Sequence, residues 1–91
     1  MTQIIVAPER LEGVASTFDT KKVETEEIIS ALRGVMESLD AEWDGVAQSK
    51  FYAQWNEMLP KMARFTDLLA QIASELRHVA QVFRETDEHV I

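Results

Sequence analysis

Apolar residues recur along the second half of this chain at alternating spacings of four and three, without a miss. The series consists of Phe51, Trp55, Met58, Met62, Phe65, Leu69, Ile72, Leu76, Val79 and Phe83. Residues three and four apart share one face of an α-helix, so the series predicts a long helix with one buried stripe. We expect this helix to span about 45–86, with a polar tail at 87–91. Because the stripe stays in phase on both sides of Pro60, we expect a kink near residue 60 and not an end.

The first half of the chain predicts another helix, over about residues 8–40. Pro8 suits its first turn, where the missing N–H loses no hydrogen bond. Its apolar stripe comprises Leu11, Val14, Ala15, Phe18, Ile28, Ile29, Leu32, Val35, Met36 and Leu39. Three polar residues interrupt this stripe: Lys21, Lys22 and Thr25. Either the helix breaks near residues 16–20, or it is continuous with a partly solvated middle. We favour continuity, because neither Gly nor Pro occurs between residues 14 and 33.

The tripeptide Trp43-Asp44-Gly45 is the strong break between these two helices. Asp44 suits the N-cap of the second helix, because its carboxylate can accept a hydrogen bond from an N–H of the first turn. A connection as short as 41–45 makes the two helices antiparallel neighbours. The sequence therefore predicts an all-α, single-domain helical hairpin.

Such a hairpin covers only part of its own apolar stripe. If half of ten large side chains stayed in water, the loss would be on the order of 10 kcal/mol, as large as the stability of a domain. A second hairpin would complete a four-helix bundle. We therefore expect a homodimer, or else a heterodimer with a similar small helical protein. The dimer and core seam is assigned to the apolar series from Phe51 to Val79.

The formal net charge of −7 disfavours nucleic acid and anionic membrane surfaces as partners. No stretch approaches the roughly 18 apolar residues that a membrane span needs, so we expect no stable membrane insertion. The start of the chain, 1–7, lacks the basic region and apolar core of a cleaved signal peptide. These observations predict a protein made in the cytoplasm without a cleaved leader.

Enzyme chemistry finds little support in the sequence. There is no Cys, which excludes disulfides, thiolate catalysis and Cys-ligated zinc. His78 and His89 are too far apart for a one-turn metal pair, and Glu75 with His78 forms a single Glu-x-x-His, whereas a di-metal bundle needs two. A Gly-rich phosphate loop and a nucleophile elbow are also missing. We expect neither catalysis nor a cofactor, and a metal-binding helical bundle is the weakest alternative.

Two positions allow both a structural and a functional interpretation. Trp43 can cap the end of the bundle while Gly45 lets the chain turn, or it can offer its ring to another protein. Spacing alone favours the packed Trp. Phe83 and Asp87 lie four apart on one helix face. Phe83 can simply close the core series, or the pair can form a short linear signal.

Taken together, these features resemble the Trp-X-Gly family of small, early-secreted-antigen-like substrates of bacterial type VII secretion. The resemblance covers the whole chain and rests on its length, the helical pattern, the central Trp43-Asp44-Gly45 and the aromatic Phe51 that follows. It implies a hairpin that dimerises into an antiparallel four-helix bundle. It also implies export without a cleaved leader, through a membrane machine with an FtsK/SpoIIIE-type ATPase, and an association with virulence.

Members of that family carry a C-terminal Tyr-x-x-x-Asp/Glu export signal. The nearest match here spans residues 83–87, with Phe83 in place of Tyr and Asp87 as the acid. Either an aromatic ring suffices, or a partner supplies the full signal, or this chain is exported differently. The resemblance further implies a composite site in which Trp43 and Gly45 of one subunit lie near Phe83 and Asp87 of the other.

The leading hypothesis is therefore a secreted, non-enzymatic type VII substrate or adaptor that acts as a dimer. Its alternative is an intracellular helical interaction module, such as a targeting partner for a larger secreted toxin.

Overall fold

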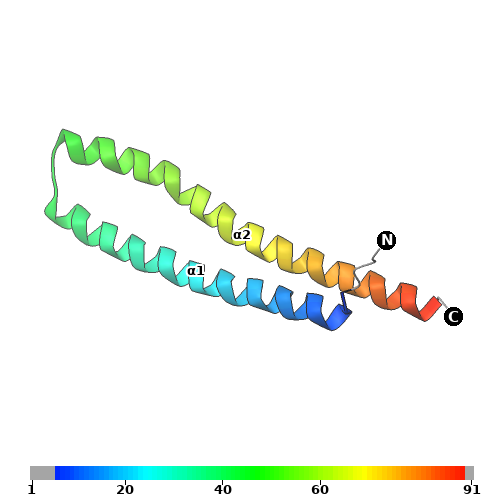
Figure 1. Cartoon of the computed structure of the whole chain (residues 1–91). Coiled ribbons are helices and arrows are strands. Elements are labelled where there is room, and N and C mark those ends of the chain that lie inside the picture. Colours follow the sequence, from blue (N-terminus) through cyan, green and yellow to red (C-terminus); the bar gives the residue numbers. More distant parts are fainter. Residues whose placement is uncertain (1–5, 90–91) are drawn as a thin grey trace.

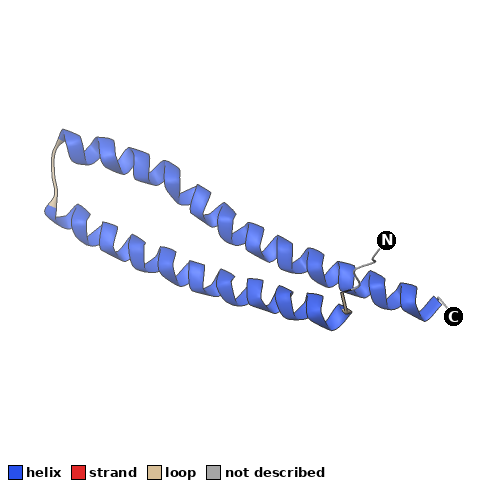
Figure 2. Ribbon diagram, viewed as in Figure 1, coloured by secondary structure: helices blue, strands red, loops and turns tan. Residues whose placement is uncertain are grey.

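Two long antiparallel helices form the described part of the chain (Figure 1). Helix α1 spans Pro8–Glu42 and helix α2 spans Val46–His89. The computed structural model describes residues 6–89, with side chains up to Thr86. Between the helices only a short connection is non-helical (Figure 2). The chain forms a rod of 71 × 22 × 20 Å. The predicted all-α hairpin is thus confirmed, and neither described helix is long and apolar enough to cross a membrane.

Helix α1 is continuous through the polar stretch where the sequence left a break open. Ion pairs cover this stretch on the solvent side: Lys21 Nζ lies 3.0 Å from Glu24 Oε2, and Lys22 Nζ lies 3.4 Å from Glu26 Oε1. Pairs three and four residues apart stabilise a helix modestly, by about 0.2–0.5 kcal/mol each. The helix then ends at Glu42, two residues beyond the expected 8–40.

The connection turns the chain through one extended residue and one glycine with positive φ. Trp43 leaves α1 with extended backbone (φ −122°, ψ 130°), and Gly45 has φ +111°, a region that L side chains rarely adopt. The Gly45 carbonyl accepts from the Ser49 N–H at 3.1 Å, so Gly45 is the N-cap of α2. The predicted Asp44 cap is wrong, because Asp44 lies one residue too early and its Oδ1 accepts from the Gly45 N–H at 2.8 Å.

Helix α2 contains Pro60 without ending there. Figure 1 shows the ribbon bending in the yellow-green stretch around residue 60, and the two helices diverge from there toward the connection. A proline removes one backbone hydrogen bond and crowds the preceding turn, which accounts for a bend. The helix starts at residue 46 and continues to His89, into the tail expected at 87–91, of which 90–91 lie outside the described residues.

Small side chains form the tightly packed part of the hairpin. The buried residues are Ala15 of α1 and Thr66, Leu69, Ala73 and Ala80 of α2. Small side chains let two helix backbones approach closely. The buried residues all lie in the half of the rod away from the connection, where the two helices are close together (Figure 1). No large side chain among the described residues is fully buried, which leaves the hairpin with a thin core.

The hairpin has two contrasting long faces. One, here called the apolar face, carries the exposed residues Ile28, Leu32, Val35 and Leu39 of α1 and Phe51, Met58, Phe65, Val79 and Phe83 of α2. On this side a shallow hollow of about 330 Å³ lies between the two helices. Its lining includes Ile28 and Leu32 of α1 and Met62 and Phe65 of α2. The opposite, polar face is crossed by the ion pairs Glu12–Arg84 and Asp19–Arg77.

Candidate functional site

Three aromatic rings gather at the connection between the helices. The Trp43 ring centroid lies 5.7 Å from that of Phe51 and 6.2 Å from that of Tyr52, and Phe51 and Tyr52 meet edge to face at 5.5 Å. These are favourable aromatic distances. Trp43 is half-buried against the start of α2, whereas Phe51 is 37% exposed. The tip therefore holds Trp43 in a fixed position and still leaves part of an aromatic surface in water. We call these three residues the aromatic tip.

Tyr52 links the two helices next to this cluster. Its hydroxyl donates to the Met36 carbonyl oxygen at 2.6 Å, and one turn closer to the tip the Gln48 side-chain amide donates to Asp40. Burial, with a further contribution from the nearby Asp40 carboxylate, raises the pKa of Tyr52 above its usual value. Sequence analysis missed Tyr52, because it lies outside the apolar series. Its adjacency to Phe51 is the one signal that could have drawn attention to it.

The ten-residue apolar series of α2 faces two different environments. Leu69 is buried between the helices, at 9% exposure. Four members are half-buried at the edge of the hairpin core: Trp55, Met62, Ile72 and Leu76. The remaining five are exposed on the apolar face: Phe51, Met58, Phe65, Val79 and Phe83. Only part of the stripe therefore packs within the chain.

The candidate C-terminal segment lies at the other end of the rod. Phe83 is 39% exposed. The next residue, Arg84, turns to α1 and donates two hydrogen bonds to the Glu12 carboxylate, at 2.5 and 2.7 Å, with Glu9 Oε1 at 3.6 Å. The Arg84 hydrogen bonds hold the pKa of Glu12 below its ordinary value, and the same contact raises that of Arg84. Asp87 belongs to helical backbone, but its side chain lies outside the described residues.

Within one chain these candidate residues do not come together. Trp43 and Gly45 mark one end of a rod 71 Å long, and Phe83 lies near the other end. Figure 1 places the connection and the C-terminus at opposite ends of the hairpin. A site that combines both groups therefore needs a second chain.

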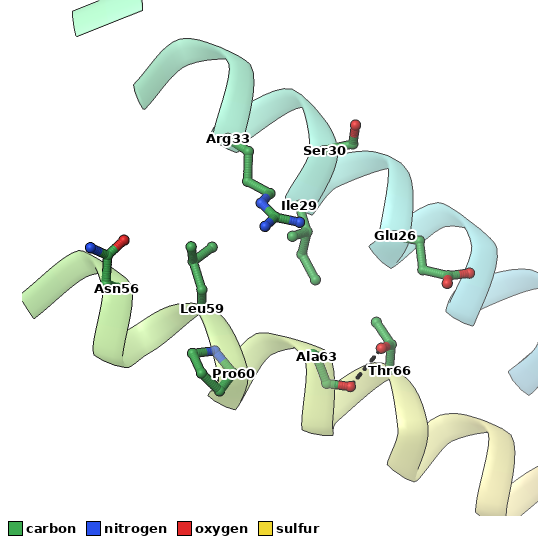
Figure 3. A pocket seen from close by; sticks show the side chains of 9 residues that line it. All are labelled: Glu26, Ile29, Ser30, Arg33, Asn56, Leu59, Pro60, Ala63 and Thr66. Carbon is green, nitrogen blue, oxygen red and sulfur yellow. Dashed lines mark hydrogen bonds between the residues drawn. The ribbon is translucent and has the colours of Figure 1, made fainter. Parts of the chain in front are cut away.

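A groove opens between the helices on the polar face, where they diverge. It measures about 580 Å³ and is lined by Glu26, Ile29, Ser30, Arg33, Asn56, Leu59, Pro60, Ala63 and Thr66. Figure 3 shows Ile29 and Leu59 pointing toward each other while Arg33 reaches over the groove from α1. Among the side chains that the structure describes, up to Thr86, no group of three or more His, Asp or Glu could hold a metal ion. The groove thus offers a surface of mixed polar and apolar side chains.

Comparison with known proteins gives one consistent result. The family model described as "Proteins of 100 residues with WXG" matches residues 3–88. An ESAT-6-like protein of Streptococcus agalactiae is 32% identical over 90 residues, covering 99% of this chain and 94% of that protein. The type VII secretion system extracellular protein A of Staphylococcus aureus is 27% identical over 90 residues, with 99% and 93% covered.

Solved structures agree in fold as well as in sequence. The secreted protein EsxB of Bacillus anthracis superposes with a TM-score of 0.79 at 32% identity, covering 96% of this chain and 99% of that one. EsxA of Geobacillus thermodenitrificans gives a TM-score of 0.80 at 26% identity, with 97% and 96% covered. The chain therefore belongs to the WXG family of proteins of about 100 residues, with Trp43-Asp44-Gly45 as its WXG tripeptide at the hairpin tip.

Proposed function

We propose that this chain is a non-enzymatic protein exported by a type VII secretion system, as a substrate or adaptor. The observation that carries the proposal is the family match over residues 3–88, together with a WXG tripeptide held at the tip of a two-helix rod. A relative in Staphylococcus aureus is named as an extracellular protein of that system, and the Bacillus anthracis relative is named as secreted. Export would then proceed from the cytoplasm without a cleaved signal peptide.

The working form is a dimer joined through the apolar face. The chain exposes 7180 Å², whereas a compact monomer of 10.4 kDa exposes about 5400 Å². Its radius of gyration is 20.7 Å, against about 12 Å for a compact domain of this length. The excess of about 1800 Å² per chain is larger than the roughly 800 Å² that each partner of a standard interface buries and is in the range of obligate homodimers. The apolar face runs along both helices, so a second copy packed against this face would complete a four-helix bundle. A similar small helical protein is the alternative occupant.

Recognition requires an antiparallel arrangement of the two copies. The aromatic tip and the Phe83 segment lie at opposite ends of one hairpin, so antiparallel pairing brings the tip of one copy beside the C-terminal segment of the other. The composite site would contain Trp43 and Gly45 from one copy and Phe83 and Asp87 from its partner. The FtsK/SpoIIIE-type ATPase of the secretion machine would recognise this composite site by binding its exposed aromatic surface.

An export assay tests this function. Wild type and Trp43→Ala are expressed in a host with and without the secretion ATPase, and the protein in culture supernatant and in cells is quantified. We expect ATPase-dependent export of the wild type and loss of export for Trp43→Ala, with helix content largely retained. A matched control is Val46→Ala, because Val46 is 73% exposed and lies next to the tip but outside the aromatic contacts.

Two outcomes would count against the proposal. Normal export of a folded Trp43→Ala variant would remove the recognition role of the tip. Retention of the wild type inside intact cells that carry a working ATPase would favour the alternative, an intracellular helical interaction module that accompanies a larger secreted protein.

A further inference from the structure

We propose that Glu12, through its ion pair with Arg84, is a positioning residue that keeps the C-terminal recognition segment helical and turns Phe83 outward. The inference rests on the proposed function and assigns a role in it to the first helix. The segment in question, residues 83–87, lies in the last turns of α2, where the red end of the ribbon runs past the start of α1 (Figure 1). A helix end without neighbours frays, because its last carbonyls have no intrahelical partner.

The contact between Arg84 and Glu12 fixes the orientation of the Arg84 side chain. Arg84 presents two guanidinium nitrogens to the two carboxylate oxygens of Glu12, at 2.5 and 2.7 Å, and such a bidentate pair fixes direction as well as distance. A second carboxylate, Glu9 of the first turn, lies 3.6 Å from the same guanidinium. Among the described side chains, Arg84 is the most C-terminal residue of α2 that is bonded to α1.

The ion pair bears on recognition because Arg84 directly follows Phe83 on the helix. Successive residues on a helix differ by about 100° in direction. Arg84 is held toward α1 on the polar face, and the preceding Phe83 points in a different direction, onto the apolar face, where it is 39% exposed. Loss of the pair frees the last turns of α2 to unwind, and the direction of Phe83 is then no longer defined.

The hairpin contains a matched control for this role. Arg77 Nη2 lies 2.5 Å from Asp19 Oδ2, so a second Arg–carboxylate pair, with one hydrogen bond in place of two, crosses the same face of the hairpin seven residues before Arg84 on α2. Both pairs are partly exposed and tie the same two helices together. Only the Glu12 pair involves a residue of the 83–87 segment. A role in general stability predicts that loss of either pair reduces export, whereas a positioning role predicts reduced export for the Glu12 pair alone.

The test compares Glu12→Gln with Asp19→Asn in the full-length protein. For Glu12→Gln we expect amide hydrogen exchange in residues 80–89 to rise by about 2- to 5-fold, the factor that corresponds to an exposed ion pair. Export into the supernatant should fall at least about twofold in parallel. For Asp19→Asn both quantities should stay at their wild-type values. The exchanged pair, Glu12→Arg with Arg84→Glu, should restore slow exchange and export.

Phe83→Ala, measured in the same assay, keeps this inference separate from the proposed function. If Phe83→Ala abolishes export while Glu12→Gln changes neither exchange nor export, the positioning role is refuted and the recognition segment stands. If Asp19→Asn reduces export as much as Glu12→Gln, the pair acts through general stability and the inference is also refuted. Normal export of Phe83→Ala would instead refute recognition at this segment, and with it the positioning role.

Discussion

Phe65 is the side chain that best tests whether the apolar face is an interface. In the single hairpin it is 51% exposed, so about 100 Å² of a phenylalanine of about 200 Å² faces water. Burying that area contributes about 2.5 kcal/mol at 25 cal/mol per Å², of which Phe65→Ala would remove about 2 kcal/mol. A symmetric dimer contains the residue twice, so dissociation should become easier by about 4 kcal/mol. This corresponds to a dimer dissociation constant raised about a thousandfold.

Sedimentation equilibrium over a range of protein concentrations measures this constant directly. Val23→Ala is the matched control, because Val23 is 53% exposed and lies outside the apolar face. Helix content by circular dichroism must accompany each measurement, since a variant that weakens the proposed dimer would also destabilise a hairpin with so thin a core and make its thermal midpoint depend on concentration. An unchanged dissociation constant for a helical Phe65→Ala would refute the apolar face as the interface. An equal loosening by Val23→Ala would refute the reasoning from exposed area.

Three further changes test the hairpin itself. Leu69→Ala should cost about 2–4 kcal/mol of unfolding free energy, because Leu69 is buried between the helices; a urea titration that finds no loss would place it outside the core. Gly45→Ala should cost about 1–3 kcal/mol through backbone strain at φ +111° alone, since no atom lies within 4 Å of the added Cβ; an unchanged thermal midpoint would contradict this conformation. Glu12 has a pKa held below its ordinary 4.5 by Arg84, so its stabilisation is complete above about pH 4.5 and is lost as the pH falls through the folded-state pKa. Glu12→Gln should remove this part of the acid dependence of the thermal midpoint, and an identical pH profile would argue against the pair.

The hairpin could be predicted from the sequence because two independent signals agree. The apolar spacing defines each helix, and Trp43-Asp44-Gly45 separates them. Spacing could not decide which part of the stripe packs within the chain. The buried positions include Thr66, Ala73 and Ala80, which score weakly as hydrophobic residues but permit close helix approach. The predicted ten-residue apolar series of α2, which includes only large side chains, therefore contains both core and surface residues.

The candidate site was predictable only where it is local in sequence. The tripeptide at the tip and the 83–87 segment can be read directly from neighbouring residues. The Tyr52 bond to the Met36 carbonyl joins residues 16 apart, and the Arg84 pair with Glu12 joins residues 72 apart. Both contacts depend on the register between the helices, which the turn geometry at Gly45 sets and which apolar spacing does not encode. The same turn geometry makes Gly45 the N-cap of α2, in place of the predicted Asp44.

The narrow cross-section of the rod has a consequence for passage through a narrow opening. A compact domain of 91 residues is about 30 Å across in every direction, so it must unfold to enter a channel narrower than that. This hairpin measures only 22 × 20 Å across its long axis. End-on, it fits an aperture that would exclude a globular protein of the same mass. A single folded hairpin can thus pass lengthwise with its backbone hydrogen bonds intact, so the proposed dimer would need to separate, but not to unfold, before it enters such an aperture.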